Sequence, residues 1–259
     1  MKPVMLALVM LAFGGPSASA APDGAPGAAP KTAPREDPFA MSRQHMITHH
    51  LAARDIHSPH VLHAMSTVPR ERFVPRERRG LSYADHPLPI GHRQTISQPY
   101  IVALMTQLAG AKPGMKALDV GTGSGYQAAV LSRIVDRVYG IEIVCPLAER
   151  AKKTLAGLEY DNITVRCGDG YRGWPEHAPF DLIILAAAPT VIPPALIEQL
   201  RPGGRLVLPV GDDTQRLKVV VRTENGHRID DHGGVRFVPM TGEVRGDPEP
   251  PGLPAAIPK

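Results

Sequence analysis

Residues 117–127 read Ala-Leu-Asp-Val-Gly-Thr-Gly-Ser-Gly-Tyr-Gln, and this stretch decides the fold. The apolar run Ala117–Val120 is typical of a short buried strand, and the apolar spacing of Tyr126–Ile134 is typical of a helix. The glycines of the loop between them, Gly121–Gly125, let the backbone approach a ligand closely. Tight turns also need glycine for steric reasons, so the loop alone does not identify a ligand.

Strand-like and helix-like segments alternate from this point onward. The expected strands are Ala117–Val120, Val138–Ile143, Ile163–Cys167, Leu182–Ala187 and Arg205–Val210, with two further β-rich runs, Leu217–Thr223 and Val235–Val238, at one edge. Helices are expected at Tyr126–Ile134 and Leu147–Leu155. The alternation predicts an α/β fold with a doubly wound, mainly parallel sheet, which binds its ligand at the carboxyl ends of the strands.

Three acidic residues follow or end successive strands. Glu142 lies 21 residues after Gly121, where an acid can accept hydrogen bonds from both hydroxyls of a ribose. Asp119 and Asp169 would add to an acidic lining that repels a pyrophosphate but suits a sulfonium cation carrying an adenosine. The GxGxG spacing also differs from the GxGxxG of dinucleotide sites. We therefore expect S-adenosylmethionine as the cofactor, although each acid could instead cap a turn.

The expected cofactor-binding residues share one feature, which is their position in or beside these strand ends. They are Asp119, Gly121, Thr122, Gly123, Ser124, Gly125, Glu142, Asp169 and Gly170.

A second segment, Thr95-Ile96-Ser97-Gln98-Pro99, precedes a helix whose apolar residues Ile101, Leu104, Met105 and Leu108 form one stripe. Serine followed by proline at the first helical positions is an ordinary N-cap, which is one reading of Ser97. A helix N-terminus with a hydroxyl is also a ready carboxylate site. Both roles can hold together.

The rest of the chain suggests one domain with extensions. Residues 1–20 combine a basic start, a short apolar run and a small-residue cleavage site, as in a secretory signal too short to anchor the chain in a membrane. The alternative is translation from Met41. Residues 21–40 and 247–259 are proline-rich and predicted disordered, leaving a domain over 41–246. The net charge of +4, spread along the chain, does not imply nucleic acid.

Upstream of the glycine loop, His45 to Met65 is predicted helical. Its histidines lack an acidic ligand, so we expect a solvated face and no metal. The basic stretch Arg70 to Arg79 is interrupted by Glu71 and Glu77 and is predicted to be a solvated turn. Cys145 and Cys167 are expected as buried free thiols, with pairing open to them if the chain is exported.

Taken together, these residues resemble the protein-L-isoaspartate O-methyltransferase family over roughly Met41 to Glu243. The matching stretches are Val68–Pro75, Pro87–Gly91, Gln94–Pro99, Asp119–Gln127, Gly168–Gly170, Ala178–Asp181, Gln199–Leu200 with Gly203–Gly204, Pro209–Gly211 and Phe237–Pro239. The glycine loop is shared by many methyltransferases, whereas Gln94–Pro99 with Phe73-Val74-Pro75 is far more specific. Asp119 replaces a common Glu, and His92-Arg93 replaces a small or polar pair.

The resemblance implies a Rossmann-like methyltransferase domain that transfers a methyl group from S-adenosylmethionine to the free carboxylate of L-isoaspartyl residues. It places the active-site serine at Ser97 and substrate contacts at Thr95, Ile96, Ser97, Gln98 and Val238. The ester would then close spontaneously to a succinimide, which hydrolyses partly to normal aspartate. It also implies isoaspartyl proteins as partners, a monomer, and the cytoplasm, where the cofactor is made; the leader favours the periplasm or secretion instead.

Two rival functions use the same residues differently. A methyltransferase for a small molecule or another acceptor would share the cofactor half alone. A non-catalytic binding protein would carry a degraded pocket, and the intact loop with Glu142 and Asp169 argues against it.

Overall fold

The computed structural model of this chain describes residues 37–243. The leader, nearly all of the proline-rich linker and the C-terminal tail expected from the sequence lie outside the described residues. Among the described residues, Pro38 and those that follow it belong to one compact unit. The elements in chain order are α1 (Ala40–His45), η1 (Met46–Ala52), α2 (Pro59–Thr67), η2 (Arg70–Arg72), η3 (Arg76–Leu81), β1 (Leu88–Gly91), β2 (Gln94–Ile96), α3 (Pro99–Leu108), β3 (Lys116–Val120), α4 (Tyr126–Ser132), β4 (Arg137–Glu142), α5 (Cys145–Ala156), β5 (Ile163–Cys167), η4 (Gly170–Arg172), η5 (Pro175–His177), β6 (Phe180–Leu185), α6 (Pro194–Glu198), β7 (Leu200–Val210), β8 (Gln215–Thr223) and β9 (Gly226–Val235).

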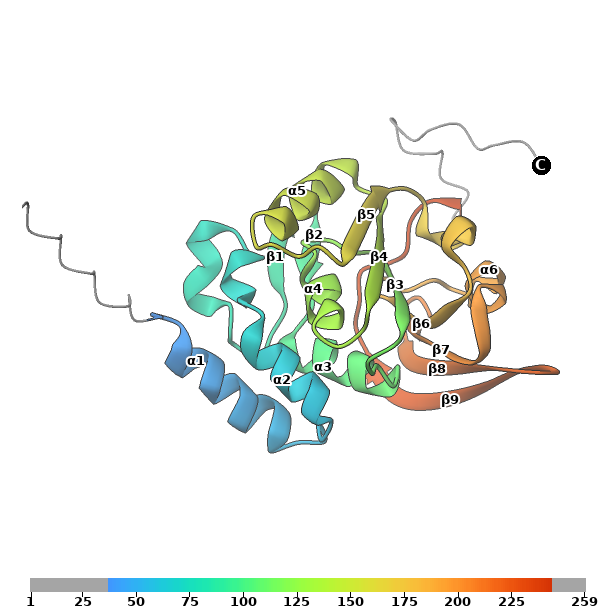
Figure 1. The fold of residues 1–259 in the computed structure, drawn as a ribbon, viewed down its shortest axis with the longest axis horizontal. Helices are drawn as coiled ribbons and strands as arrows, with labels where there is room; N and C mark the ends of the chain where they lie inside the picture. Colours follow the sequence, from blue (N-terminus) through green and yellow to red (C-terminus); the bar gives the residue numbers. More distant parts are fainter. Residues whose placement is uncertain (1–36, 244–259) are drawn as a thin grey trace, which may run out of the picture. The chain divides into compact units, whose positions relative to one another are not determined.

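A seven-stranded sheet in the order β5-β4-β3-β6-β7-β8-β9 forms the centre of this unit (Figure 1). The strands from β5 to β7 run parallel, and β8 and β9 pair antiparallel at one edge. The chain moves outward from β3 through β4 to β5 and then returns to place β6 on the other side of β3. This reversal creates a crevice beyond the carboxyl ends of β3 and β6.

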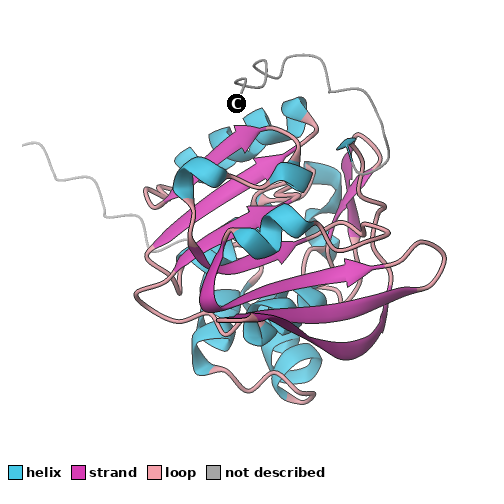
Figure 2. Cartoon of the chain, turned by 90° about the vertical axis from the view of Figure 1, so that its right-hand side faces the viewer, coloured by secondary structure: helices cyan, strands magenta, loops and turns pink. Residues whose placement is uncertain are grey.

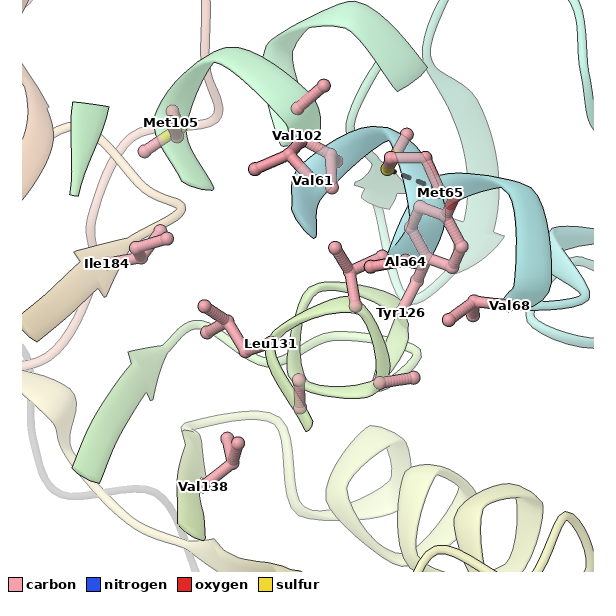
Figure 3. Packing of buried hydrophobic residues seen from close by; sticks show 14 of the residues in the cluster. Val61, Ala64, Met65, Val68, Val102, Met105, Tyr126, Leu131, Val138 and Ile184 are labelled. Atoms are coloured by element: carbon pink, nitrogen blue, oxygen red, sulfur yellow. Dashed lines mark hydrogen bonds between the residues drawn. The ribbon is translucent and has the colours of Figure 1, made fainter. Parts of the chain in front are cut away.

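Side chains alternate along the strands and fill two cores, one on each face of the sheet. Leu182 and Ile184 of β6 belong to the core under α2 to α5, whereas Ile183 and Leu185 belong to the core that contains Leu196 of α6. Figure 3 shows the first core, where Met65 of α2 meets Tyr126 of α4. Figure 2 shows helices on both faces of the sheet. The doubly wound, mainly parallel sheet is confirmed.

Two sequence-based boundaries need correction. The helix expected from His45 to Met65 is interrupted by residues 53–58, and Ser58 caps α2 by accepting from the Val61 N–H. The last strand is Gly226–Val235, so only Val235 of the run Val235–Val238 is in it. Residues 236–238 have left the sheet, and this places Val238 at the cavity described below.

Helix α3 is buried more broadly than a single stripe. Met105 is fully buried, but Ile101, Leu104 and Leu108 are only half-buried, and Val102 and Ala103 take fully buried positions. The reason is that α3 lies against α2, η1 and β7, so its protein-facing surface is wider than one apolar row.

Cys145 and Cys167 form a disulfide, which corrects the expectation of free thiols. Cys167 ends β5 directly opposite Glu142 of β4, and Cys145 begins α5 three residues after Glu142. The pairing of β4 with β5 brings the two sulfurs together, a proximity that the sequence separation of 22 residues does not reveal.

Within residues 37–243 no helix is long and apolar enough to cross a membrane. The same residues contain no group of three or more metal-ligating side chains that could hold an ion. The histidines near the start of the domain instead contact one another, with the His45 and His49 rings 4.5 Å apart.

Candidate active site

An open cavity of about 910 Å³ lies beyond the carboxyl ends of β3, β4 and β6, in the crevice that the strand order creates. This volume includes open solvent at the mouth of the cavity. The residues around it come from the glycine loop, the two neighbouring strand ends, the β2–α3 segment and the chain after β9. They are Gln94–Ser97, Val102, Met105, Val120–Ser124, Tyr126, Gln127, Ile141–Ile143, Gly170, Leu185–Ala187 and Val238–Thr241.

The glycine loop uses its own N–H groups to hold its shape. The N–H groups of Gly121 and Thr122 both donate to the Ile141 carbonyl, and that of Gly125 donates to Thr122. The fourth, on Gly123, donates to the Glu142 carboxylate over 2.7 Å. Because four of the five N–H groups of the loop are already engaged, the loop offers no nest of several free N–H groups for a pyrophosphate.

Glu142 is the acid that faces the cavity. It is 5 % exposed, and its second oxygen accepts from the Val144 N–H over 2.9 Å. Burial raises its pKa, and the backbone donors of Val144, Gly123 and Ile143 oppose that rise. A carboxylate has about four acceptor positions, so Glu142 can hold the loop and still accept hydrogen bonds from a ligand's hydroxyls.

The other two acids of the expected lining, Asp119 and Asp169, are not among the residues around the cavity. Asp169 caps η4 by accepting from the Tyr171 N–H over 2.9 Å, and its other oxygen accepts from the Glu243 N–H. Asp119 lies completely buried beneath the loop and accepts from the Thr122 hydroxyl over 3.0 Å. The cap that the sequence left open as an alternative is therefore the observed contact of Asp169.

Burial strongly shifts the pKa of the Asp119 carboxyl. Desolvation raises its pKa to about 7, although the Thr122 hydrogen bond favours the charged form. Its second oxygen has no hydrogen-bond partner among the described residues. A protonated carboxyl is the form that such a site tolerates best.

The free energy of unfolding of Asp119→Asn, compared with that of the parent at the same pH, is expected to increase as the pH rises. Between about pH 4 and 7 the folded Asp119 keeps its proton while the unfolded carboxyl has lost it, so unfolding releases a proton and stability falls with rising pH. Asparagine lacks this term, which is on the order of 4 kcal/mol above about pH 7, where it is fully developed. Urea unfolding at pH 5 and pH 8 measures it, with exposed Asp213→Asn as the matched control. An Asp119→Asn difference that is equal at both pH values contradicts the expectation.

The β1–β2 hairpin covers the glycine loop. A Cβ atom added to Gly123 would lie 3.3 Å from Ile90 Cδ1, so the Ile90 side chain packs closely against the loop backbone. His92 and Arg93 form the tip of the hairpin with φ of 52° and 58°. Both side chains are exposed, at the turn that leads into the cavity-lining Gln94 and Thr95.

Ser97 lies at the cavity but is not the helix N-cap. The N-cap of α3 is Gln98, whose side chain makes no capping hydrogen bond, and Gln98 does not line the cavity. In the described part of the chain the Ser97 hydroxyl has no hydrogen-bond partner, while its carbonyl accepts from the Arg70 guanidinium over 2.7 Å. The hydroxyl therefore remains available to a ligand, which a capping serine would not offer.

The sequence did not predict several of the residues that line the cavity. Tyr126 and Gln127 belong to the loop-to-helix motif, so that motif could have identified them. Ala186 and Pro239–Thr241 could not be found in this way, because their position depends on a tertiary contact. Ala188 donates to the Val238 carbonyl over 2.9 Å and accepts from Met240 over 2.8 Å, which brings the chain after β9 to the end of β6.

Arg70 and Glu71 are buried, which corrects the expectation of a solvated turn for this part of the basic stretch. Glu71 accepts from the Tyr83 hydroxyl over 2.6 Å and lies 3.6 Å from Arg43. The remaining arginines of the stretch, from Arg72 to Arg79, lie nearer the surface.

Comparison with known proteins gives one consistent result. A family model described as protein-L-isoaspartate(D-aspartate) O-methyltransferase matches residues 41–245. The protein-L-isoaspartate O-methyltransferase of Opitutus terrae is 54 % identical over 203 residues, 78 % of this chain and 87 % of that protein. The protein-L-isoaspartate O-methyltransferase 2 of Shewanella sediminis is 45 % identical over 248 residues, 95 % of this chain and 98 % of that protein.

Two solved structures are also similar. One, of a protein-L-isoaspartate O-methyltransferase, has a TM-score of 0.71 and 28 % identity and covers 78 % of this chain and 67 % of that one. The other, from Plasmodium falciparum and described as a protein-L-isoaspartate O-methyltransferase in complex with S-adenosyl-L-homocysteine, has a TM-score of 0.67 and 26 % identity. It covers 80 % of this chain and 99 % of that one.

Proposed function

Because the chain belongs to the protein-L-isoaspartate(D-aspartate) O-methyltransferase family and is an S-adenosylmethionine-dependent carboxyl methyltransferase, we propose which of its residues bind the cofactor and the isoaspartyl carboxylate. The glycine loop and Glu142 form the cofactor half of the cavity. Thr95, Ile96 and Ser97 form the acceptor half. Val238 closes the cavity beside them.

The residues around the cavity fit S-adenosylmethionine. Glu142 accepts two backbone N–H groups but has no ion-pair partner within residues 37–243, so it can accept from the ribose hydroxyls and favours a cationic ligand. The engaged N–H groups of the loop disfavour a phosphate. Gly170 is required as glycine, because a Cβ there would lie 2.2 Å from Val120 Cγ1. When bound, the cofactor supplies an electrophilic methyl group on a sulfonium leaving group.

The acceptor needs orientation more than activation. A carboxylate is already ionised at neutral pH, so no strong base has to remove a proton from it. We propose that the free Ser97 hydroxyl donates to one carboxylate oxygen and leaves the other aimed into the cofactor half. No histidine or acid contacts the Ser97 hydroxyl within residues 37–243, so Ser97 orients the substrate and does not attack it. Catalysis is then mainly positioning.

One observation carries this proposal: Ser97, with an unbonded hydroxyl, and Glu142 line the same cavity although 45 positions separate them in the chain. The test is incubation of the protein with labelled S-adenosylmethionine and matched isoaspartyl and aspartyl peptides. We expect label on the isoaspartyl peptide alone. Equal labelling of both peptides would favour an enzyme with another acceptor, and labelling of neither would remove the assignment.

For the compartment, we infer that the mature enzyme acts outside the cytoplasm, in an oxidising environment. The Cys145–Cys167 disulfide supports this, because disulfides persist mainly in exported proteins. The signal-like pattern of residues 1–20 supports it independently.

Intact-mass measurement on the protein from fractions of its native host tests the inference. We expect a chain that lacks residues 1–20, lies outside the cytoplasm and is lighter by the two hydrogens lost in the disulfide. A full-length cytoplasmic chain with two alkylatable thiols would contradict it.

A further inference from the structure

Arg70 is a buried cation without a carboxylate partner among the described residues. Its side chain is 0 % exposed, and desolvation lowers its pKa. The neighbouring acid in sequence, Glu71, is turned toward Arg43 and Tyr83 instead. A buried charge is costly unless it is paired and hydrogen-bonded, so the position of this one calls for a compensating partner.

The contacts of Arg70 join the two halves of the cavity. Its Nε donates to the Ser82 carbonyl and its Nη2 to the Ser97 carbonyl, each over 2.7 Å. Its guanidinium carbon lies 4.7 Å from the ring centre of Tyr126, the first residue of the helix that follows the glycine loop. Ser97 and Tyr126 both line the cavity. Arg70 therefore lies directly behind the acceptor segment and the loop-to-helix turn.

The third guanidinium nitrogen of Arg70 differs from the other two. Nη1 of Arg70 is buried and has no hydrogen-bond partner among the described residues. Both hydrogen-bond acceptors of the guanidinium among the described residues are neutral carbonyls. Asp85 is the acid whose charge acts on Arg70, and it does so from beyond ion-pair distance, so the positive charge is only partly balanced. In a medium of low dielectric constant such a charge acts over a longer range than it does in water.

We propose that Arg70 is a positioning residue for the acceptor: its fork holds the Ser97 backbone so that the hydroxyl faces the cavity, and its only partly balanced charge favours an anionic over a neutral acceptor there. The inference rests on the proposed role of Ser97 and adds to it a source of charge selectivity. The isoaspartyl carboxylate would supply the negative charge with which no described carboxylate pairs Arg70.

The test compares two peptides of the same sequence, one with the free isoaspartyl carboxylate and one with a carboxamide in its place. Their dissociation constants are measured by calorimetry in the presence of S-adenosylhomocysteine. The parent enzyme is expected to prefer the carboxylate. Arg70→Gln is expected to reduce this preference about tenfold, the effect of losing about 1.4 kcal/mol of charge-specific interaction. A purely structural role would weaken both peptides equally.

The matched control is Arg72→Gln, which removes the same charge from the same short helix at an exposed side chain. It is expected to leave the preference unchanged. Arg70→Lys covers the case in which Arg70→Gln does not fold: lysine keeps the charge but lacks the fork, so the preference should persist while kcat/KM for the isoaspartyl peptide falls.

The outcomes separate this inference from the proposed function. If the parent methylates the isoaspartyl peptide but Arg70→Gln keeps the full preference, or loses affinity for both peptides alike, the role of Arg70 is overturned and the function stands. Parent-like kcat/KM in Arg70→Lys also overturns it. A parent enzyme that methylates neither peptide overturns the function itself.

Discussion

Glu142→Ala is expected to bind S-adenosylhomocysteine about 100-fold more weakly than the parent, a loss of about 3 kcal/mol. Two effects add. The proposed hydrogen bonds from the ribose hydroxyls lose their charged acceptor, and the N–H groups of Gly123 and Val144 lose theirs. The second effect matters for the cofactor as well, because the Gly123 contact holds the glycine loop against the end of β4. Calorimetric titration with S-adenosylhomocysteine measures the change.

Two variants separate charge from shape in this experiment. Glu142→Gln keeps an acceptor oxygen of similar size and is expected to lose less affinity than alanine. Glu149→Ala removes an exposed acid that pairs with Lys152 on α5 and is expected to bind like the parent. Parent-like affinity in Glu142→Ala, with an unchanged melting temperature, would place the ribose elsewhere.

Ser97→Ala is expected to lower kcat/KM for an isoaspartyl peptide by about 10- to 100-fold, the range for loss of one hydrogen bond to a charged group. The hydroxyl makes no hydrogen bond within residues 37–243, so its removal should cost the folded protein little. Affinity for S-adenosylhomocysteine should stay within about twofold, because Ser97 lies in the acceptor half. Steady-state kinetics with peptide as the varied substrate gives the result.

Ser97→Thr provides the control, since it restores a hydroxyl at the same backbone position. Partial recovery of kcat/KM is expected, limited by the added methyl group in a half-buried place. Unchanged kinetics in Ser97→Ala would leave the backbone of residues 95–97 as the sole contact of the carboxylate. A matching drop in cofactor affinity would instead move Ser97 into the cofactor half.

Local patterns predicted most of the sheet because each strand is a short apolar run between turn residues. Ile163–Cys167 has the predicted bounds, and β3, β4 and β8 differ by one or two residues at their ends. The prediction failed where tertiary contacts decide the structure. Residues 236–238 have the composition of a strand, yet they leave the sheet because the backbone of Val238 pairs with Ala188.

For the candidate site, too, the sequence predicted one part and tertiary contacts decided the other. The sequence placed the glycine loop, Glu142 and Ser97 in one function, and Ser97, Glu142 and all of the loop except Gly125 line one cavity. It could not distinguish a cap from a ligand contact, because both uses of an acid require the same residue at the same strand end. Only the fold shows that Asp169 caps η4 and that Asp119 lies under the loop.

By itself, the sequence determined the doubly wound sheet, the methyltransferase family and the two segments to which we assign the chemistry, since these depend on periodicity and on motifs contiguous in the chain. The tertiary structure alone decided the Cys145–Cys167 pairing, the burial of Arg70 behind Ser97 and the position of Glu142 as the one acid, within residues 37–243, that lines the cavity. The physical reason is that burial and side-chain pairing depend on how helices and strands that are distant in sequence pack against one another. A residue's neighbours in sequence do not specify which atoms will desolvate it.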